Sequence, residues 1–313
     1  MTAAPGLPRF ADALSRFVFE HTAVRGALAS LDVCCRDILA CHAYPPALRR
    51  VLAELLAAAA LLASTLKFNG SLIVQLRGDG PVRMLVVECD AALALRATAQ
   101  WRDDAESLPA TTDLATLAGS TARSRLAITL DPKDGGPLYQ GIVGLEAASV
   151  ATLIEHYLTT SEQIESRVVL ATDGDRARGL LLQRLPGAGA ADDAAWEIAA
   201  AAASAMTSAD LLDAPGPAAL LGAHFPAADI RLFEPRAAHF ACGCSETRIG
   251  NALRLLGRAE VDGILAEQGR VGATCEFCNR QYTLTAAQAR ALFADDPRPD
   301  AGLRAAPAGG LPH

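Results

Sequence analysis

The segment from Pro45 to Lys67 reads PPALRRVLAELLAAAALLASTLK, and its pattern decides how the first half of the chain folds. Two prolines stand at its start, and the first turn of a helix tolerates proline because it needs no N–H there. Behind them, apolar residues recur at helical spacing, at Leu48, Val51, Leu52, Leu55, Leu56 and Leu62. The pattern predicts a long, buried helix from Ala47 to Lys67.

After this helix the hydrophobic pattern changes to the two-residue period of a strand. Short apolar runs between residues 71 and 97 are separated by turn residues such as Gly78-Asp79-Gly80, which predicts an antiparallel meander. Further strands are expected at 125–130, 139–145, 167–171 and 179–185, with a hairpin loop at 131–137 and a helix at 149–159. Because helices and antiparallel strands are interleaved without a regular β-α-β repeat, the predicted fold class is α+β.

The composition is that of a globular chain with room for two domains. Of the 313 residues, 51% are hydrophobic and 20% are charged, so a large core can form. The net charge of -7 argues against a nucleic-acid partner. Residues 1–9 do not resemble a signal peptide, and the longest uncharged apolar stretches have 12 residues, against the ~20 that span a bilayer. We therefore expect a cytoplasmic protein that does not enter a membrane.

Four of the eight cysteines form two closely spaced pairs. Cys242-Gly243-Cys244 is a C-x-C pair and Cys275-Glu276-Phe277-Cys278 is a C-x-x-C pair, with 30 residues between them. Cysteines of an unexported chain meet a reducing pool, and two such pairs complete the four-thiolate shell that zinc prefers. We predict one Zn²⁺ per chain, held by Cys242, Cys244, Cys275 and Cys278.

The residues between the two cysteine pairs predict a helical hairpin. Ser245 can cap a helix at 246–256 that stops at Gly257, and a second helix at 260–268 ends at Gly269. Because the core of such a hairpin is small, metal binding would contribute directly to its folding. A permanent zinc knuckle that never switches fits the same spacing. A catalytic zinc does not, because four protein thiolates leave no open position for water or substrate.

The other cysteines and the histidines show no paired metal spacing, although the adjacent Cys34 and Cys35, with Cys41 six residues on, make a second site conceivable. Buried free thiols are the default expectation for the cysteines of the first half, which are Cys34, Cys35, Cys41 and Cys89. His239 is close enough in sequence to Cys242 to compete for the metal. Surface or capping roles are expected for the remaining lone histidines, His42, His156 and His224.

An alanine-rich stretch separates the first domain from the cysteine pairs. Pro186-Gly187-Ala188-Gly189 marks the end of the first domain, and helices are expected at 196–206, at 209–212 behind Ser208 as a cap, and at 218–225. Alanine favours helix but buries a single methyl group, so these helices gain little per residue from docking, on the scale of ~25 cal/mol per Å². We expect a segment that comes loose easily; a stable helical connector is the alternative.

With these residues in view, the chain resembles the bacterial redox-regulated chaperones known as the 33-kilodalton heat-shock proteins. The resemblance covers almost the whole length and includes Thr22-Ala23-Val24-Arg25-Gly26, Leu66-Lys67-Phe68-Asn69-Gly70, Val74–Pro81, Glu88-Cys89-Asp90, Tyr139–Val143, Ser161-Glu162-Gln163 and Gly179–Pro186. Its most specific part is at the C-terminal end, in Phe240, Cys242, Cys244-Ser245, Leu255-Leu256-Gly257, Cys275–Asn279 and Tyr282.

The resemblance implies a holdase chaperone that is switched by oxidation and needs no ATP. It implies four segments: a core at 1–186, a metastable helical linker at 187–235, a zinc-binding redox-switch domain at 236–295 and a flexible tail at 296–313. On oxidation, Cys242 would pair with Cys244 and Cys275 with Cys278. Zinc would leave, the linker would unfold, and the opened chain would form a homodimer that binds unfolding client proteins.

Two other classes of function fit the residues less well. A nucleic-acid-binding module would need a basic groove with aromatic platforms, whereas aromatic residues form 5% of the chain. The seven arginines between Arg236 and Arg290 exceed the acidic residues there by two, which the formal -2 of a zinc tetrathiolate cancels. An enzyme would need a nucleophile with its base or an open metal site, and no such set stands out. We therefore expect a chaperone that is not an enzyme.

Overall fold

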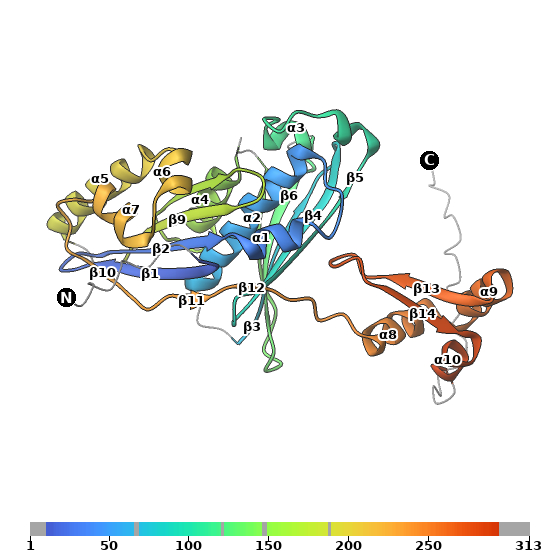
Figure 1. Cartoon of the computed structure of the whole chain (residues 1–313). Coiled ribbons are helices and arrows are strands. Elements are labelled where there is room, and N and C mark those ends of the chain that lie inside the picture. The colour runs from blue at the N-terminus through green and yellow to red at the C-terminus, as the bar shows by residue number, and fades with distance from the viewer. Residues whose placement is uncertain (1–10, 66–68, 120–121, 146–148, 187–188, 294–313) are drawn as a thin grey trace, which may run out of the picture. The chain divides into compact units, whose positions relative to one another are not determined.

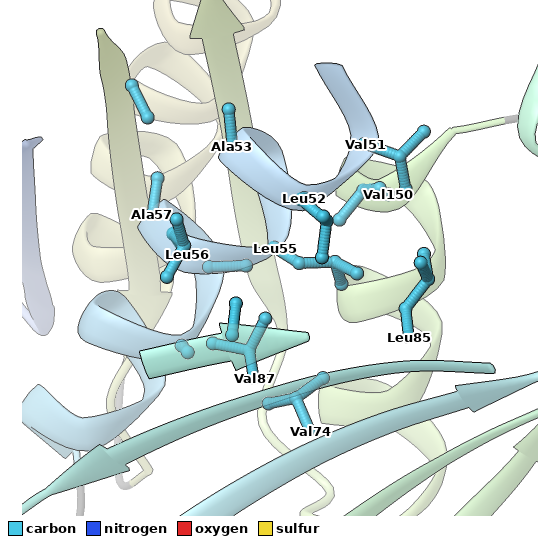
Figure 2. Close-up of a cluster of buried hydrophobic side chains, with 14 of the residues drawn as sticks. Val51, Leu52, Ala53, Leu55, Leu56, Ala57, Val74, Leu85, Val87 and Val150 are labelled. Atoms are coloured by element: carbon cyan, nitrogen blue, oxygen red, sulfur yellow. The ribbon is translucent and has the colours of Figure 1, made fainter. Parts of the chain in front are cut away.

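The helix α2 (Pro46–Thr65) lies between two mainly antiparallel sheets in the computed structural model, which describes residues 11–65, 69–119, 122–145, 149–186 and 189–293. Of its 20 residues, 14 are buried, so the helix is covered on nearly every side. Side chains such as Leu52 and Leu55 pack towards Val74 and Val87 of one sheet (Figure 2). The predicted helix is confirmed; Leu66 and Lys67, its last two predicted residues, lie outside the described residues.

The first sheet has the strand order β10-β1-β2-β9-β8, with β11 paired to β1. Its strands are β1 (Ala13–Phe19), β2 (Val24–Leu31), β8 (Ser166–Thr172), β9 (Ala177–Arg184), β10 (Ile230–Leu232) and β11 (Arg236–Ala237). It packs closely on α2 at Gly179, where an added Cβ would lie 2.7 Å from Cδ1 of Leu61. A glycine in β9 therefore sets how near this sheet comes to the helix.

The second sheet has the strand order β12-β5-β4-β3-β6-β7. Its strands are β3 (Gly70–Arg77), β4 (Val82–Asp90), β5 (Ala94–Trp101), β6 (Arg125–Pro132), β7 (Tyr139–Gly144) and β12 (His239–Phe240). The predicted meander and hairpin are confirmed, because β3, β4 and β5 pair in antiparallel succession and β6 pairs with β7. Three further elements flank these strands: a 3-10 turn at Asp103–Ser107, α3 (Leu114–Ala118) and α4 (Val150–Thr160), which Ser149 caps. The predicted α+β class is confirmed.

Three helices cover the face of the first sheet that α2 leaves open (Figure 1). They are α5 (Ala190–Ser204), α6 (Ser208–Asp213) and α7 (Pro217–His224). Their contact with the sheet extends well beyond alanine methyl groups, because Trp196, Leu220 and Phe225 are buried in it. The sheet contributes Phe17, Phe19, Val24, Leu28, Leu180 and Leu182.

The N-cap of α6 differs from the predicted one. Ser208 was expected to cap α6, but the cap is Thr207, whose hydroxyl accepts a hydrogen bond from Asp210 N at 3.1 Å. The Asp210 carboxylate in turn accepts from Thr207 N at 2.8 Å. The helix begins one residue earlier than expected because this reciprocal pair satisfies two donors at once.

The chain divides into two compact units, whose described residues lie within 11–241 and 242–293. The division falls after β10, β11 and β12, which pair with strands of the first unit. The expected segment boundaries at 186, 235 and 295 stay predictions, and residues 187–188 and those from 294 onward lie outside the described ranges. Within those ranges, no helix is both long and apolar enough to cross a membrane.

The second unit is built from α8 (Glu246–Leu256), α9 (Arg258–Gln268), β13 (Arg270–Thr274), β14 (Gln281–Thr285) and α10 (Ala286–Ala291). The predicted helices are confirmed, with Ser245 accepting from Arg248 N and Gly257 and Gly269 at positive φ, 98° and 72°. The hairpin of β13 and β14 was not predicted. Among the described residues of the unit, the buried core consists of Leu253, Val261, Leu265, Val271 and Ala289.

Trp196→Ala should loosen the cover over the first sheet. The side chain is 1% exposed, and truncating a buried tryptophan costs about 3–5 kcal/mol. Hydrogen exchange should show earlier opening of residues 190–225 in this variant, while β3–β6 keep their protection. Ile198→Ala is the matched control, since Ile198 lies on the same helix and is 72% exposed. Equal exchange in the two variants would contradict the packing described above.

Candidate metal centre

The two cysteine pairs come from two loops of the second unit. Cys242 and Cys244 lie in the segment that leads into α8, and Ser245 begins the helix immediately after them. Cys275 and Cys278 lie in the turn that joins β13 to β14, where Asn279 N donates to Cys275 O at 2.9 Å. Asn279 has a φ of 56°, a left-handed conformation that asparagine tolerates better than most residues. Strand pairing and helix capping thus hold both loops in place.

The four sulfur atoms meet in one cluster, with every ligand atom within 4.8 Å of the others. Cys242 Sγ lies 3.6 Å from Cys275 Sγ, and Cys244 Sγ lies 3.4 Å from Cys278 Sγ. Four sulfurs at ~2.3 Å from a central zinc would be separated by about 3.8 Å along the edges of a tetrahedron. The spacing therefore fits one ion with a closed, four-sulfur shell.

Burial and hydrogen bonding distinguish the four thiols. Burial raises the pKa of Cys242, and it raises the pKa of Cys278 to about 12. Cys244 differs, because the Tyr282 hydroxyl lies 3.1 Å from its sulfur and lowers its pKa to about 7. A divalent cation at the centre of the cluster would favour the thiolate form of every ligand, as bound metal ions do.

Two arginines lie beside the cluster. A Cβ added to Gly243 would lie 3.2 Å from Nη1 of Arg248, so this guanidinium lies against the C-x-C loop. Arg280 interacts first with the Tyr282 hydroxyl and then with the charges of Cys244 and Cys278, which raises the pKa of Arg280. Two positive groups are thus placed where a zinc tetrathiolate would carry its formal -2 charge.

The remaining candidates lie elsewhere. Among the residues that the structure describes, only these four cysteines form a group of three or more potential ligands, and His239 does not belong to it. Burial raises the pKa of Cys35 to about 12 and that of Cys89 to about 12, and it also raises the pKa of Cys34. Cys41 donates to Asp37 O at 3.4 Å. The buried thiols stay protonated and unreactive at neutral pH.

Cys242→Ser and Cys278→Ser should each lose most of the bound metal, because each removes one of four ligands and a serine hydroxyl is a poor substitute for a thiolate. Metal analysis of the purified reduced chain measures the loss. Cys41→Ser is the control, since Cys41 lies outside the cluster, and it should keep the wild-type metal content. Full retention in both cluster variants would rule out the four-cysteine site.

Comparison with known proteins identifies the family of the chain. A family model described as "Hsp33 protein" matches residues 12–285, a range that includes all four cysteines. The 33 kDa chaperonin of Methylobacillus flagellatus is 42% identical over 287 residues, which cover 91% of this chain and 95% of that protein. The 33 kDa chaperonin of Chromobacterium violaceum is 40% identical over 284 residues, 90% of this chain and 94% of that protein.

A solved structure shows the same fold. The crystal structure of the 33 kDa chaperonin from Thermotoga maritima superposes with a TM-score of 0.77 at 20% sequence identity. The match covers 90% of this chain and 98% of that chain. The family model matches most of the chain, and the relatives are of about the same length. The chain belongs to the Hsp33 family, which is a family of chaperones.

Proposed function

We propose that the chain is a redox-regulated, ATP-independent holdase in the cytoplasm, with the four-cysteine cluster as its sensor. The observation that carries the proposal is the gathering of four thiols in a unit whose described residues form a buried core of five. A core of that size supplies little folding energy, so the unit depends on its metal ligands. A change in the state of the thiols therefore becomes a change in folding.

Zinc is the metal that this donor set suits best. All four ligands are sulfur, and soft thiolates in a tetrahedron favour zinc over magnesium or calcium, which take oxygen ligands. Cys242, Cys244, Cys275 and Cys278 would hold one ion in the reduced chain. A closed thiolate shell has a structural role, which agrees with a protein that is a chaperone rather than an enzyme.

Oxidation would convert the ligands into disulfides. Two thiolates transfer two electrons to one hydrogen peroxide molecule; an S–S bond forms, the O–O bond breaks, and two protons complete two molecules of water. We propose the pairs Cys242–Cys244 and Cys275–Cys278, each formed within its own loop. Across the two loops the sulfurs lie 3.6 and 3.4 Å apart, whereas an S–S bond is about 2.05 Å long, so forming a disulfide in this cluster requires the loops to move.

Loss of the thiolate ligands would unfold the second unit. Metal-coupled folding energy is on the order of 10 kcal/mol for small zinc modules, more than five buried residues replace. We propose that the linker at 187–235 then opens. Its helices would leave the first sheet and bare the apolar face that they cover, which includes Phe17, Phe19, Val24, Leu28, Leu180 and Leu182.

The face beneath the linker suits the proposed clients. Unfolding proteins expose apolar segments, and an uncovered sheet face bearing two phenylalanines and four aliphatic side chains would bind them without chemistry or ATP. The same face explains the proposed homodimer of the oxidised form, since two bared apolar surfaces attract each other as they attract clients. Clients and a second copy of the chain would compete for it.

The linker is held by polar contacts as well as by its buried side chains. Asp192 Oδ1 accepts a hydrogen bond from Ala23 N at 2.9 Å, and Arg184 pairs with Asp193. These contacts join the first turn of α5 to the β1–β2 turn, at the residue before β2, and to the last residue of β9. Surface ion pairs contribute little, about 0–1 kcal/mol, so the apolar contact decides whether the linker stays docked.

Peroxide at raised temperature, or hypochlorite, should release zinc and raise holdase activity together. Dithiothreitol with zinc should reverse both, because it restores the thiolate ligands. The measurements are zinc content, thiol count, disulfide mapping by mass spectrometry and suppression of client aggregation. In a Cys242→Ser, Cys278→Ser double variant, which lacks two of the four ligands, neither zinc content nor holdase activity should respond to the oxidant. Holdase activity equal in the reduced and oxidised wild type would identify a permanent zinc knuckle and refute the switch.

Hydrogen exchange should locate the opening. After oxidation, residues 194–225 should lose protection before β3–β6 do, because the linker rests on one sheet face whereas β3–β6 belong to the two-sheet core around α2. If β3–β6 lost protection before residues 194–225 did, the proposed order of events would be wrong.

A further inference from the structure

The hydroxyl of Tyr282 lies against one sulfur of the cluster. Tyr282 Oη donates to Cys244 Sγ at 3.1 Å, across 38 positions of sequence. Tyr282 lies on β14 and pairs with Ala273 of β13, so the hairpin that carries Cys275 and Cys278 also carries the donor. Cys244 belongs to the other loop. The hydrogen bond therefore links the two halves of the cluster independently of any ion.

We propose that Tyr282 is a positioning residue of the metal centre, whose hydroxyl holds Cys244 in the ligand geometry and makes its sulfur less reactive towards electrophiles. The inference rests on the proposed binding of zinc. A thiolate that accepts a hydrogen bond shares its negative charge with the donor, so its lone pairs are less available for attack. Outer partners of this kind also fix the ligand's orientation, and removing them typically costs about 10–100-fold in metal affinity.

The surroundings of Tyr282 support a polar role for its hydroxyl. The side chain is half-buried, and its hydroxyl points at a sulfur rather than into the small apolar core, to which the ring does not belong. Arg280 interacts with the same hydroxyl, which strengthens it as a donor. A phenylalanine would keep the ring and remove only the oxygen. The contribution of the hydrogen bond can therefore be separated from that of the ring.

Tyr282→Phe should bind zinc about 10–100-fold more weakly than the wild type in competition with a chromophoric chelator. Thr283→Ala is the matched control, since Thr283 is the exposed next residue on the same strand, and it should bind zinc as the wild type does. Circular dichroism of the zinc-loaded chains checks that both variants are folded.

Alkylation of individual cysteines separates positioning from plain structural support. In the zinc-loaded reduced chain, a sulfur attacks the methylene carbon of iodoacetamide, an S–C bond forms, the C–I bond breaks and iodide leaves. Mass spectrometry of early time points gives the initial rate at each cysteine. In Tyr282→Phe the rate at Cys244 should rise several-fold relative to Cys242 of the same loop, because only Cys244 loses a hydroxyl donor.

The outcomes distinguish this inference from the proposed switch. Unchanged zinc affinity in Tyr282→Phe, or equal acceleration at all four cysteines, would overturn the positioning role, the second by showing that Tyr282 merely stabilises the hairpin. Weaker zinc binding with selective acceleration at Cys244 would support it. If holdase activity of the wild type did not respond to oxidation while those two effects appeared, the proposed switch would fail and the role of Tyr282 would stand.

Discussion

The burial of α2 on nearly all of its surface is the constraint on which the rest of the first unit depends. A helix with 14 buried residues out of 20 cannot rest on one sheet and leave its other side in water, so it needs apolar cover on both sides. The two sheets provide it. Each sheet then has a second face, and the face of the first sheet that carries Phe17 and Phe19 is too apolar to remain exposed. The alanine-rich helices α5–α7 cover this face.

This arrangement gives the proposed switch its physical basis. The core around α2 takes contributions from both sheets, α1 (Val33–Leu39), α2 and α4, whereas the cover over the first sheet belongs to one continuous stretch of chain. The helices of this cover can detach from the first sheet while the core around α2 stays folded. The two groups of thiols differ in the same way: Cys34, Cys35 and Cys89 are buried in the core, and three of the four clustered cysteines remain partly accessible. Three cysteines of the cluster, together with Cys41, are therefore more accessible to a dissolved oxidant than the three thiols of the core.

Local pattern was sufficient wherever one element carried its own signal. The helical spacing of 47–65, the strands between 71 and 97, and the helix signals at Ser245, Gly257 and Gly269 were all confirmed, because periodicity and caps act within a few residues. The strands β1 and β2 were missed. Both faces of β2 are covered, so its sequence lacks the alternation of apolar and polar residues that marks a strand with one solvent-exposed face. The start of α1 was hidden for another reason, since the carboxylate of Asp12, about 20 residues upstream, accepts hydrogen bonds from Val33 N and Cys34 N.

The sequence by itself determined which residues could bind metal, because C-x-C and C-x-x-C spacing places two sulfurs on one ion whatever the surrounding fold. It also determined the α+β class through the order of its helical and alternating segments. Only the tertiary structure decided that the Tyr282 hydroxyl reaches the sulfur of Cys244. It also decided that the helices after residue 189 pack on the first sheet through the large side chains of Trp196, Leu220 and Phe225 as well as through alanine methyl groups. The sheet face that they cover belongs to β1, β2 and β9. These contacts join residues far apart in sequence, and the strand register and helix packing that bring them together are properties of the whole chain.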